Sequence, residues 1–395
     1  SDKTRSRFGR RRPYIFSGAI LGGITFALMW QIPVGLSPTA YFTFLTVSLI
    51  LFYTAFTLFT VPYHAIGYEM TSDYHERTGV MSYRMFFNMI GNICAGWLLA
   101  GTQLEWFDST LQGARFIGPL TGLVFILFGL APVFFIKERK EVQSSAAKKQ
   151  FPIFQSLFAT LKDKSFRLLI GLTVLMLSGW TFATSIIVFI NVSYVFPGDL
   201  KASSILLGSM GMAQTAIVVF ALMAATRISK KLGKKAILKF SFSIQFLHVL
   251  AAWFLITPNN PYLQIGAYMI GAVANMTFFL MLHSMTSDIC DQDEWENGTR
   301  REGMYGAVIT WMQKLCVSIA VALVGVVLVA VGFDQAEGAI QSAQTGLSLR
   351  LIYCGIFLTI GIVGLTLLPH YPLTEKRVLE IQSDLAKRRE TSSED

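Results

Sequence analysis

The chain has 395 residues, of which 53% are hydrophobic and 14% are charged, and its formal net charge is +9. Soluble domains carry about 25% charged residues, so this composition excludes an ordinary soluble protein and indicates an integral membrane protein. The positive charge does not call for nucleic acid, because cytoplasmic loops of membrane proteins are enriched in Lys and Arg. The four cysteines have no C-x-x-C spacing, which predicts neither a disulfide framework nor a metal site.

Ten segments are long and apolar enough to cross a bilayer, since a helix needs roughly 20 residues for about 30 Å of hydrocarbon. They cover residues 14–36, 39–64, 79–102, 114–136, 166–191, 203–226, 236–257, 262–286, 303–332 and 348–369. None of them alternates with the period of a barrel strand. The sequence therefore predicts an all-α membrane protein with ten transmembrane helices.

The distribution of basic residues predicts the orientation of these helices. If residue 1 is cytoplasmic, the loops on that side hold or adjoin 27 Lys and Arg residues. The loops on the opposite side hold three, Arg115, Lys201 and Arg350. Because cytoplasmic loops carry the basic excess, we expect both termini of this chain to be cytoplasmic, in a bacterial cytoplasmic membrane.

A polar linker and an internal echo predict the domain organisation. Residues 137–165 separate an N-terminal bundle at 1–136 from a six-helix bundle at 166–369, and a cytoplasmic tail follows at 370–395. The basic SRFGRR loop at 6–11 is echoed by KKLGKK at 230–235, and T-S-D recurs at 71–73 and 286–288. Because transporters are commonly built from related halves, we expect two further helices before this chain and a twelve-helix parent fold.

Three segments resemble a known transporter family. SDKTRSRFGRRRP at 1–13 resembles the loop between the second and third helices of the major facilitator superfamily. VPYHAIGYEMTSDYHERTGVMSYRMFF at 61–87 and SDICDQDEWENGTRREGMYGAVITWMQK at 287–314 resemble the two signatures of its glycoside-pentoside-hexuronide:cation symporter family, the melibiose permease-like carriers. The resemblance implies the major facilitator fold and a carrier that couples a sugar-type solute to inward flow of Na⁺, Li⁺ or H⁺, without enzymatic activity or another cofactor.

Two basic residues within the predicted spans are functional candidates, because an ionisable side chain at membrane depth is costly unless it is paired or hydrated. Lys314 lies near the middle of its span, and the resemblance places it beside the coupling cation. Arg84 lies closer to its helix end, and the resemblance makes it a sugar contact, although it can instead pair with a loop acid. No Asp or Glu lies well inside any of the ten spans, so we expect their acidic partners in the preceding helices.

Polar residues near these two complete the predicted solute site. Asn88 and Asn92 follow Arg84 at four-residue spacing, which places all three on one helix face. Asn275 lies in the middle of a span of the C-terminal bundle. For all three asparagines, contact with solute and hydrogen bonding between helices remain open. Trp311, one turn from Lys314, has an aromatic face that suits a pyranose ring.

The resemblance assigns further positions and shows two departures. Thr57 falls beside the cation site and Thr310 on the sugar side, although lone threonines often bond their own backbone. Thr60 replaces a sugar-contacting aspartate of the melibiose carriers, and His64 replaces a stacking tryptophan. These departures favour a different glycoside or another kind of solute.

Charged loop residues predict a cytoplasmic gate. Basic residues of the first loop can meet the acids of neighbouring loops, which would favour one state of the carrier over another; plain surface solvation is the alternative. The gate candidates are Arg10, Arg11, Arg12, Glu69, Asp73, Asp288, Asp291 and Asp293.

Cation-coupled symport of a glycoside is thus the leading hypothesis for function. The expected partners are the solute, the coupling cation and membrane lipids, with the protein as a monomer. Two alternatives stay open, a carrier of a lipid-like amphiphile and a transport-incompetent fragment. No converging set of catalytic side chains is visible in the sequence, so an intramembrane enzyme is not expected.

Overall fold

The computed structural model describes residues 11–69, 74–136, 162–298, 302–334 and 340–394. Within these ranges, the side chains of 64–69, 74–86, 230, 302–303, 386 and 389–394 lie outside the description. Internal contacts divide the chain into two units, Ser1–Lys148 and Lys149–Asp395. The boundary falls inside the range 137–165, where the sequence analysis places the linker.

Among its described residues, unit 1 has four long helices, α1 (Arg12–Met29), α2 (Pro38–Glu69), α3 (Tyr74–Gly101) and α4 (Thr110–Phe135). Pro13 stands in the first turn of α1, where a missing backbone N–H costs nothing. α1 ends seven residues before the predicted span 14–36 does. The reason is local, because Pro33 and Gly35 follow and Gly35 has a φ of 81°, which cannot continue a helix.

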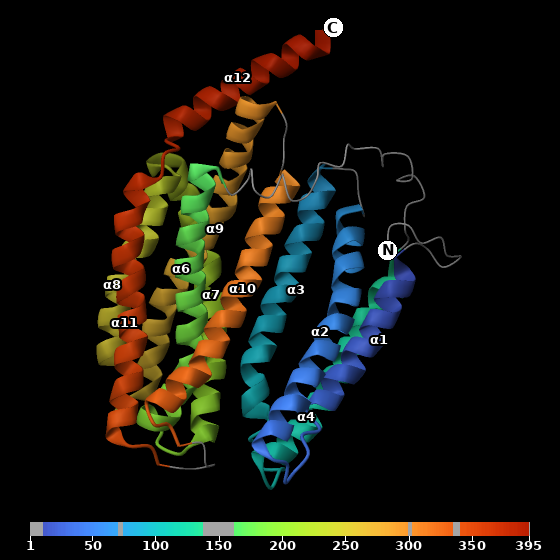
Figure 1. The fold of residues 1–395 in the computed structure, drawn as a ribbon, viewed down its shortest axis with the longest axis vertical. Coiled ribbons are helices and arrows are strands. Elements are labelled where there is room, and N and C mark those ends of the chain that lie inside the picture. Colours follow the sequence, from blue (N-terminus) through green and yellow to red (C-terminus); the bar gives the residue numbers. More distant parts are fainter. Residues whose placement is uncertain (1–10, 70–73, 137–161, 299–301, 335–339, 395) are drawn as a thin grey trace. The chain divides into compact units, whose positions relative to one another are not determined.

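Close helix crossings hold unit 1 together, with α1 packed against both α2 and α4 (Figure 1). A Cβ placed on Gly23 of α1 would lie 2.5 Å from the carbonyl oxygen of Gly122 of α4. A Cβ placed on Gly122 would likewise lie 2.5 Å from the carbonyl oxygen of Gly23. Small residues at such crossings let helix backbones approach within a membrane, where packing replaces the hydrophobic effect.

The described part of unit 2 has six long helices in its bundle and one that follows it. The long helices are α6 (Lys164–Ile190), α7 (Leu200–Leu232), α8 (Lys234–Leu255), α9 (Gln264–Asn297), α10 (Glu302–Ala330), α11 (Ala343–Leu367) and α12 (Glu375–Glu394). Short π and 3₁₀ turns occur at Asn191–Val195, Pro261–Leu263 and Leu368–His370. α8 packs mainly on α9 and α11, and α6 packs on α10 and α11.

A polar stripe on α8 is buried between its neighbours. The Ser241 hydroxyl donates to the carbonyl oxygen of Ala274 in α9 at 2.6 Å. His248 is completely buried and its Nδ1 lies 2.8 Å from the carbonyl oxygen of Ala267. Because a carbonyl only accepts, Nδ1 carries the proton and Nε2 accepts from the Tyr353 hydroxyl at 3.2 Å. These bonds join α8 to α9 and α11.

The helix boundaries show where the predicted spans were too short. Among the described residues, nine helices are long and apolar enough to cross a membrane, and the side chains described in α3 add a shorter apolar stretch, Phe87–Gly101. α9 continues to Asn297, well beyond the predicted end at residue 286. Hydropathy detects where a helix leaves the hydrocarbon, and a polar helix can continue past that point.

Candidate functional site

The threonines predicted on α2 satisfy their hydroxyls within the helix. Thr57 donates to the carbonyl oxygen of Tyr53 and Thr60 to that of Phe56, both at 2.7 Å. Thr57 also borders a groove of about 910 Å³ on unit 1, between α1 and α2. The groove is lined mostly by aliphatic side chains, and the hydroxyl-bearing residues on it are Tyr14, Thr25, Tyr53, Thr54 and Thr57. A threonine hydroxyl that donates to its own helix keeps its lone pairs for a ligand.

The polar row on α3 is partly described. Asn88 and Asn92 are both exposed, and the amide nitrogen of Asn92 donates to the side-chain and backbone oxygens of Asn88 at 3.0 Å each. The two amides therefore share one face of α3, as their spacing predicts. The side chains of Arg84, His64 and Glu69 lie outside the described part, as do Arg10 and Asp73 altogether.

Three candidates of unit 2 lie together on α10. Thr310, Trp311 and Lys314 are all exposed, with Trp311 at 62%, so they face away from the core of unit 2. Thr310 donates to the carbonyl oxygen of Gly306 at 2.8 Å. The indole and the hydroxyl can present an aromatic face and a hydrogen-bond acceptor to a polar solute, and the ammonium of Lys314 lies within one and a half turns of both.

Asn275 has different surroundings from these three. It lies on α9, is 3% exposed, and its Oδ1 has no hydrogen-bond partner among the described residues. Its neighbour Ala274 receives the bond from Ser241 of α8. The structure thus places Asn275 inside the packed bundle, and its role as a solute contact stays a prediction.

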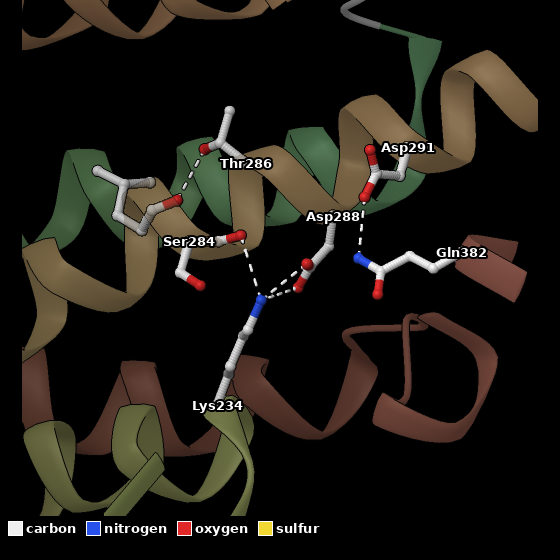
Figure 2. Close-up of polar contacts among 7 residues, drawn as sticks. Lys234, Ser284, Thr286, Asp288, Asp291 and Gln382 are labelled. Atoms are coloured by element: carbon white, nitrogen blue, oxygen red, sulfur yellow. Dashed lines mark hydrogen bonds and ion pairs between the residues drawn. The ribbon is translucent and has the colours of Figure 1, made fainter. Parts of the chain in front are cut away.

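The gate candidate Asp288 forms an ion pair within unit 2. Figure 2 shows Lys234, the first residue of α8, reaching the C-terminal third of α9, where its Nζ lies 2.6 and 2.7 Å from the two carboxylate oxygens of Asp288. The same Nζ lies 3.4 Å from the carbonyl oxygen of Ser284. Asp288 is 7% exposed. A carboxylate that is nearly buried needs such a partner, because desolvation penalises an unpaired charge.

Other gate acids on α9 also have partners inside unit 2. Asp291 accepts from the side-chain amide of Gln382 in α12 at 3.0 Å, as Figure 2 shows, and Asp293 accepts from that of Asn297 at 2.8 Å. In unit 1, Arg11 is 5% exposed and Arg12 donates to the carbonyl oxygen of Ile136 at the end of α4. The predicted pairing of these arginines with the acids of α9 stays a prediction.

Sequence reasoning missed Lys234 and Gln382 as contributors to this cluster. Lys234 was visible in the KKLGKK loop, but the first loop of the chain offered an equally basic partner for the same acids. Gln382 belongs to the segment 370–395, which the sequence analysis treats only as a tail. The apolar spacing of Val378, Ile381 and Leu385 was the signal for a helix there.

Acidic residues also gather around the start of α6. Asp163 precedes that helix, is half-buried, and its Oδ1 accepts from the backbone N–H of Phe166 at 2.7 Å. Burial raises the pKa of the Asp163 carboxyl, and the nearby charges of Glu296 and Asp293 raise it further. Burial likewise raises the pKa of Tyr371, with the charges of Asp288 and Asp163 adding to the effect. In the described part of the chain, no group of three or more His, Cys, Asp and Glu is arranged to hold a metal ion.

Known proteins are similar in sequence over most of the chain. A putative glycoside/cation symporter of Escherichia coli, YagG, is 23% identical over all of this chain and 83% of its own length. The isoprimeverose transporter of Lactiplantibacillus pentosus is 22% identical over 89% of this chain and 72% of its own length.

Solved transporter structures agree in fold. The nucleoside transporter NupG superposes with a TM-score of 0.60 at 15% identity, over 91% of this chain and 84% of that one. FucP, a major facilitator superfamily transporter, superposes with a TM-score of 0.51 at 14% identity, over 92% of this chain and 84% of that one. The family described as MFS/sugar transport protein matches residues 1–375. The chain therefore belongs to the MFS/sugar transport protein family, a family of integral membrane transporters of the major facilitator superfamily.

Proposed function

We propose that the protein is a secondary active transporter that couples a glycoside or other sugar-type solute to Na⁺, Li⁺ or H⁺ by alternating access. The family match over residues 1–375 and the symporter relatives support the transport class. The observation that carries the site is the exposed stripe of Thr310, Trp311 and Lys314 on α10. A lysine inside a transmembrane helix is a functional candidate by default, because its charge requires water or an acidic partner.

The coupling role of Lys314 rests on competition for negative charge. A mobile ammonium and a bound cation would share the same carboxylates, so occupancy by the cation would release the lysine. The excess of Lys and Arg in the loops on one side supports the proposal that both termini of the chain are cytoplasmic, and the protein is proposed to act as a monomer.

Uptake measurements with Lys314→Ala test this proposal. Membrane vesicles containing the protein would be supplied with a panel of radiolabelled glycosides, with and without an inward Na⁺ or H⁺ gradient. We expect the wild type to accumulate at least one of them in the presence of a gradient. Lys314→Ala should lose accumulation but keep exchange of solute at equal concentrations, because only coupling is removed. Accumulation by Lys314→Ala at the wild-type level would contradict the assigned role.

A lipid-like solute is the second candidate. The sodium-dependent lysophosphatidylcholine symporter 1 of Xenopus tropicalis is 21% identical over 95% of this chain and 76% of its own length. The mainly aliphatic groove between α1 and α2 offers a surface of the right chemistry for an acyl chain. Including a radiolabelled lysophospholipid in the same panel separates the two, since gradient-driven uptake of that compound and of no glycoside would favour this candidate.

A further inference from the structure

Helix α12 is docked on unit 2 through one face. Ile381 is 2% exposed and Leu385 is 6% exposed, and both pack with the hydrophobic core of unit 2. Leu379, on the other side of the helix, is 60% exposed. In Figure 1, α12 runs from the end of α11 across the end of α9. The apolar stripe of α12 therefore fixes it against the bundle, while its outer face stays open.

Polar contacts add to this docking along the last turns of α9. Gln382 donates to Asp291 at 3.0 Å, and Arg388 donates to the carbonyl oxygen of Trp295 at 3.1 Å. The guanidinium carbon of Arg377 lies 4.7 Å from the centre of the Trp295 ring, which is a cation–π contact. α12 thus contacts the end of α9 at two places one turn apart.

The chain leading into α12 also contacts the start of α8. Lys235 Nζ donates to the carbonyl oxygens of Pro369 and Tyr371, at 3.2 Å each. Gly233, whose φ is +80°, leaves room for the Glu375 carboxylate, one oxygen of which lies 2.5 Å from where a Cβ would stand. Together with the Lys234–Asp288 pair, these contacts join the charged ends of α8, α9 and α11.

We propose that α12 is a releasable strap that restrains the ends of α8, α9 and α11 near Lys234, Asp288 and Pro369. Alternating access requires helix ends to separate at one face of a carrier. The contacts of α12 suit reversible release, since exposed polar contacts are individually weak and only a short apolar stripe is buried. That α12 restrains these helix ends does not depend on the proposed function. The consequence of its release for transport rests on the proposed function.

Cys290 offers an internal reporter for the strap. This thiol is 2% exposed and lies on α9 between Asp288 and Asp291. In the full chain, labelling by a membrane-permeant maleimide would be followed by mass spectrometry of the modified peptides. Cys316 and Cys354, which are buried in α10 and α11, report on the rest of unit 2 in the same sample.

Two variants are designed to release the strap by different means, and a third variant is the matched control. Gln382→Glu places a second carboxylate against Asp291, whereas Leu385→Asp places a charge in the apolar stripe. Ser383→Glu adds the same charge as Gln382→Glu at the next residue, which is exposed. We expect both releasing variants to raise the labelling rate of Cys290 at least about threefold by local opening. The labelling rates of Cys316 and Cys354 should not change in these variants, and Ser383→Glu should leave the labelling rate of Cys290 at the wild-type value.

A rescue variant and a transport measurement complete the test. Asp291→Asn in the Gln382→Glu background removes the repulsion and should restore slow labelling of Cys290. Unchanged labelling in both releasing variants would overturn the proposal, and so would equal increases at all three buried cysteines, which indicate unfolding of unit 2. For a solute that the wild type carries, we expect a lower maximal rate at unchanged half-saturating concentration. If no solute is carried, the labelling result still decides whether α12 is a strap.

Discussion

Lys234 and Asp288 are separated by 54 positions in the sequence, yet they form a two-pronged ion pair. Their burial is unequal, because the Asp288 side chain is 9% exposed and that of Lys234 is 37% exposed. Removing the lysine leaves a carboxylate with little access to water, whereas removing the aspartate leaves an ammonium that water can reach. The two single substitutions should therefore differ in cost.

We predict that Lys234→Met lowers the free energy of unfolding by about 1 to 2 kcal/mol, with partial screening by water at the lysine keeping the value modest. Asp288→Asn should cost less than Lys234→Met. Thermal unfolding in detergent, followed by tryptophan fluorescence, measures both variants. The double variant should cost less than the sum of the two, and strict additivity would contradict the pairing.

Asp163 supplies a second prediction at the scale of single residues. Its pKa is raised above 3.8 mainly by burial, and the charges of Glu296 and Asp293 act in the same direction. A carboxyl with a raised pKa binds its proton more tightly in the folded protein than in the unfolded one. Its contribution therefore favours folding at low pH and is lost as the pH rises from about 3.8 through the pKa of the folded state.

The variant Asp163→Asn keeps an oxygen that can accept from Phe166 N–H but removes the titration. We predict that its unfolding temperature changes less than that of the wild type as the pH is raised from 3.8 toward neutrality. Asp163→Ala is the control, because it also removes the cap and should be about 1 kcal/mol less stable than Asp163→Asn at every pH. A wild-type pH dependence retained in Asp163→Asn would show that other groups cause it.

At the scale of elements, the contact between α8 and α9 depends on one glycine. A Cβ on Gly271 of α9 would lie 2.8 Å from Nδ1 and 2.7 Å from Cε1 of His248, and 3.0 Å from the Trp180 ring. His248 cannot move away without giving up its bonds to Ala267 and Tyr353. The glycine thus lets a fully buried imidazole join three helices.

We predict that Gly271→Ala lowers the free energy of unfolding by about 1 to 3 kcal/mol, since overpacking displaces the imidazole. Gly211→Ala in α7 is the matched control, because nothing lies within 4 Å of its Cβ position. That variant should change stability by less than about 1 kcal/mol and can be stabilising. Equal effects of the two substitutions in chemical or thermal unfolding would contradict this account of the α8–α9 contact.

The apolar segments of the sequence predicted the positions of the helices better than their ends. Apolar length located the helices of both units, because the bilayer sets the length of a spanning segment. The ends were less accurate, as at α9, whose last eleven residues are polar enough to leave the membrane while remaining helical. α12 was missed because its apolar residues are few, although they fall at helical spacing.

At the scale of the whole molecule, the sequence determined the class of the protein and its family resemblance. A hydrophobic fraction of 53% with few charges indicates a membrane protein, and the three motifs indicate the major facilitator superfamily, which agrees with the family match over residues 1–375. The narrower resemblance to the glycoside-pentoside-hexuronide:cation symporter family stays a prediction. These properties are carried by local composition and order, so they are readable without coordinates. The roles of Arg84, Lys314, Thr57 and the other solute and cation candidates stay predictions, as does the expectation of two preceding helices.

Only the tertiary structure decided which charges meet within unit 2. The sequence contains two basic loops that could meet Asp288, and in the folded unit its partner is Lys234, while Asp291 accepts from Gln382 on α12, which hydropathy does not predict. It also decided that Asn275 is packed inside the bundle while Lys314 is exposed on α10. The physical reason is that charge and hydropathy belong to single residues, whereas pairing and burial depend on distances between segments far apart in the chain.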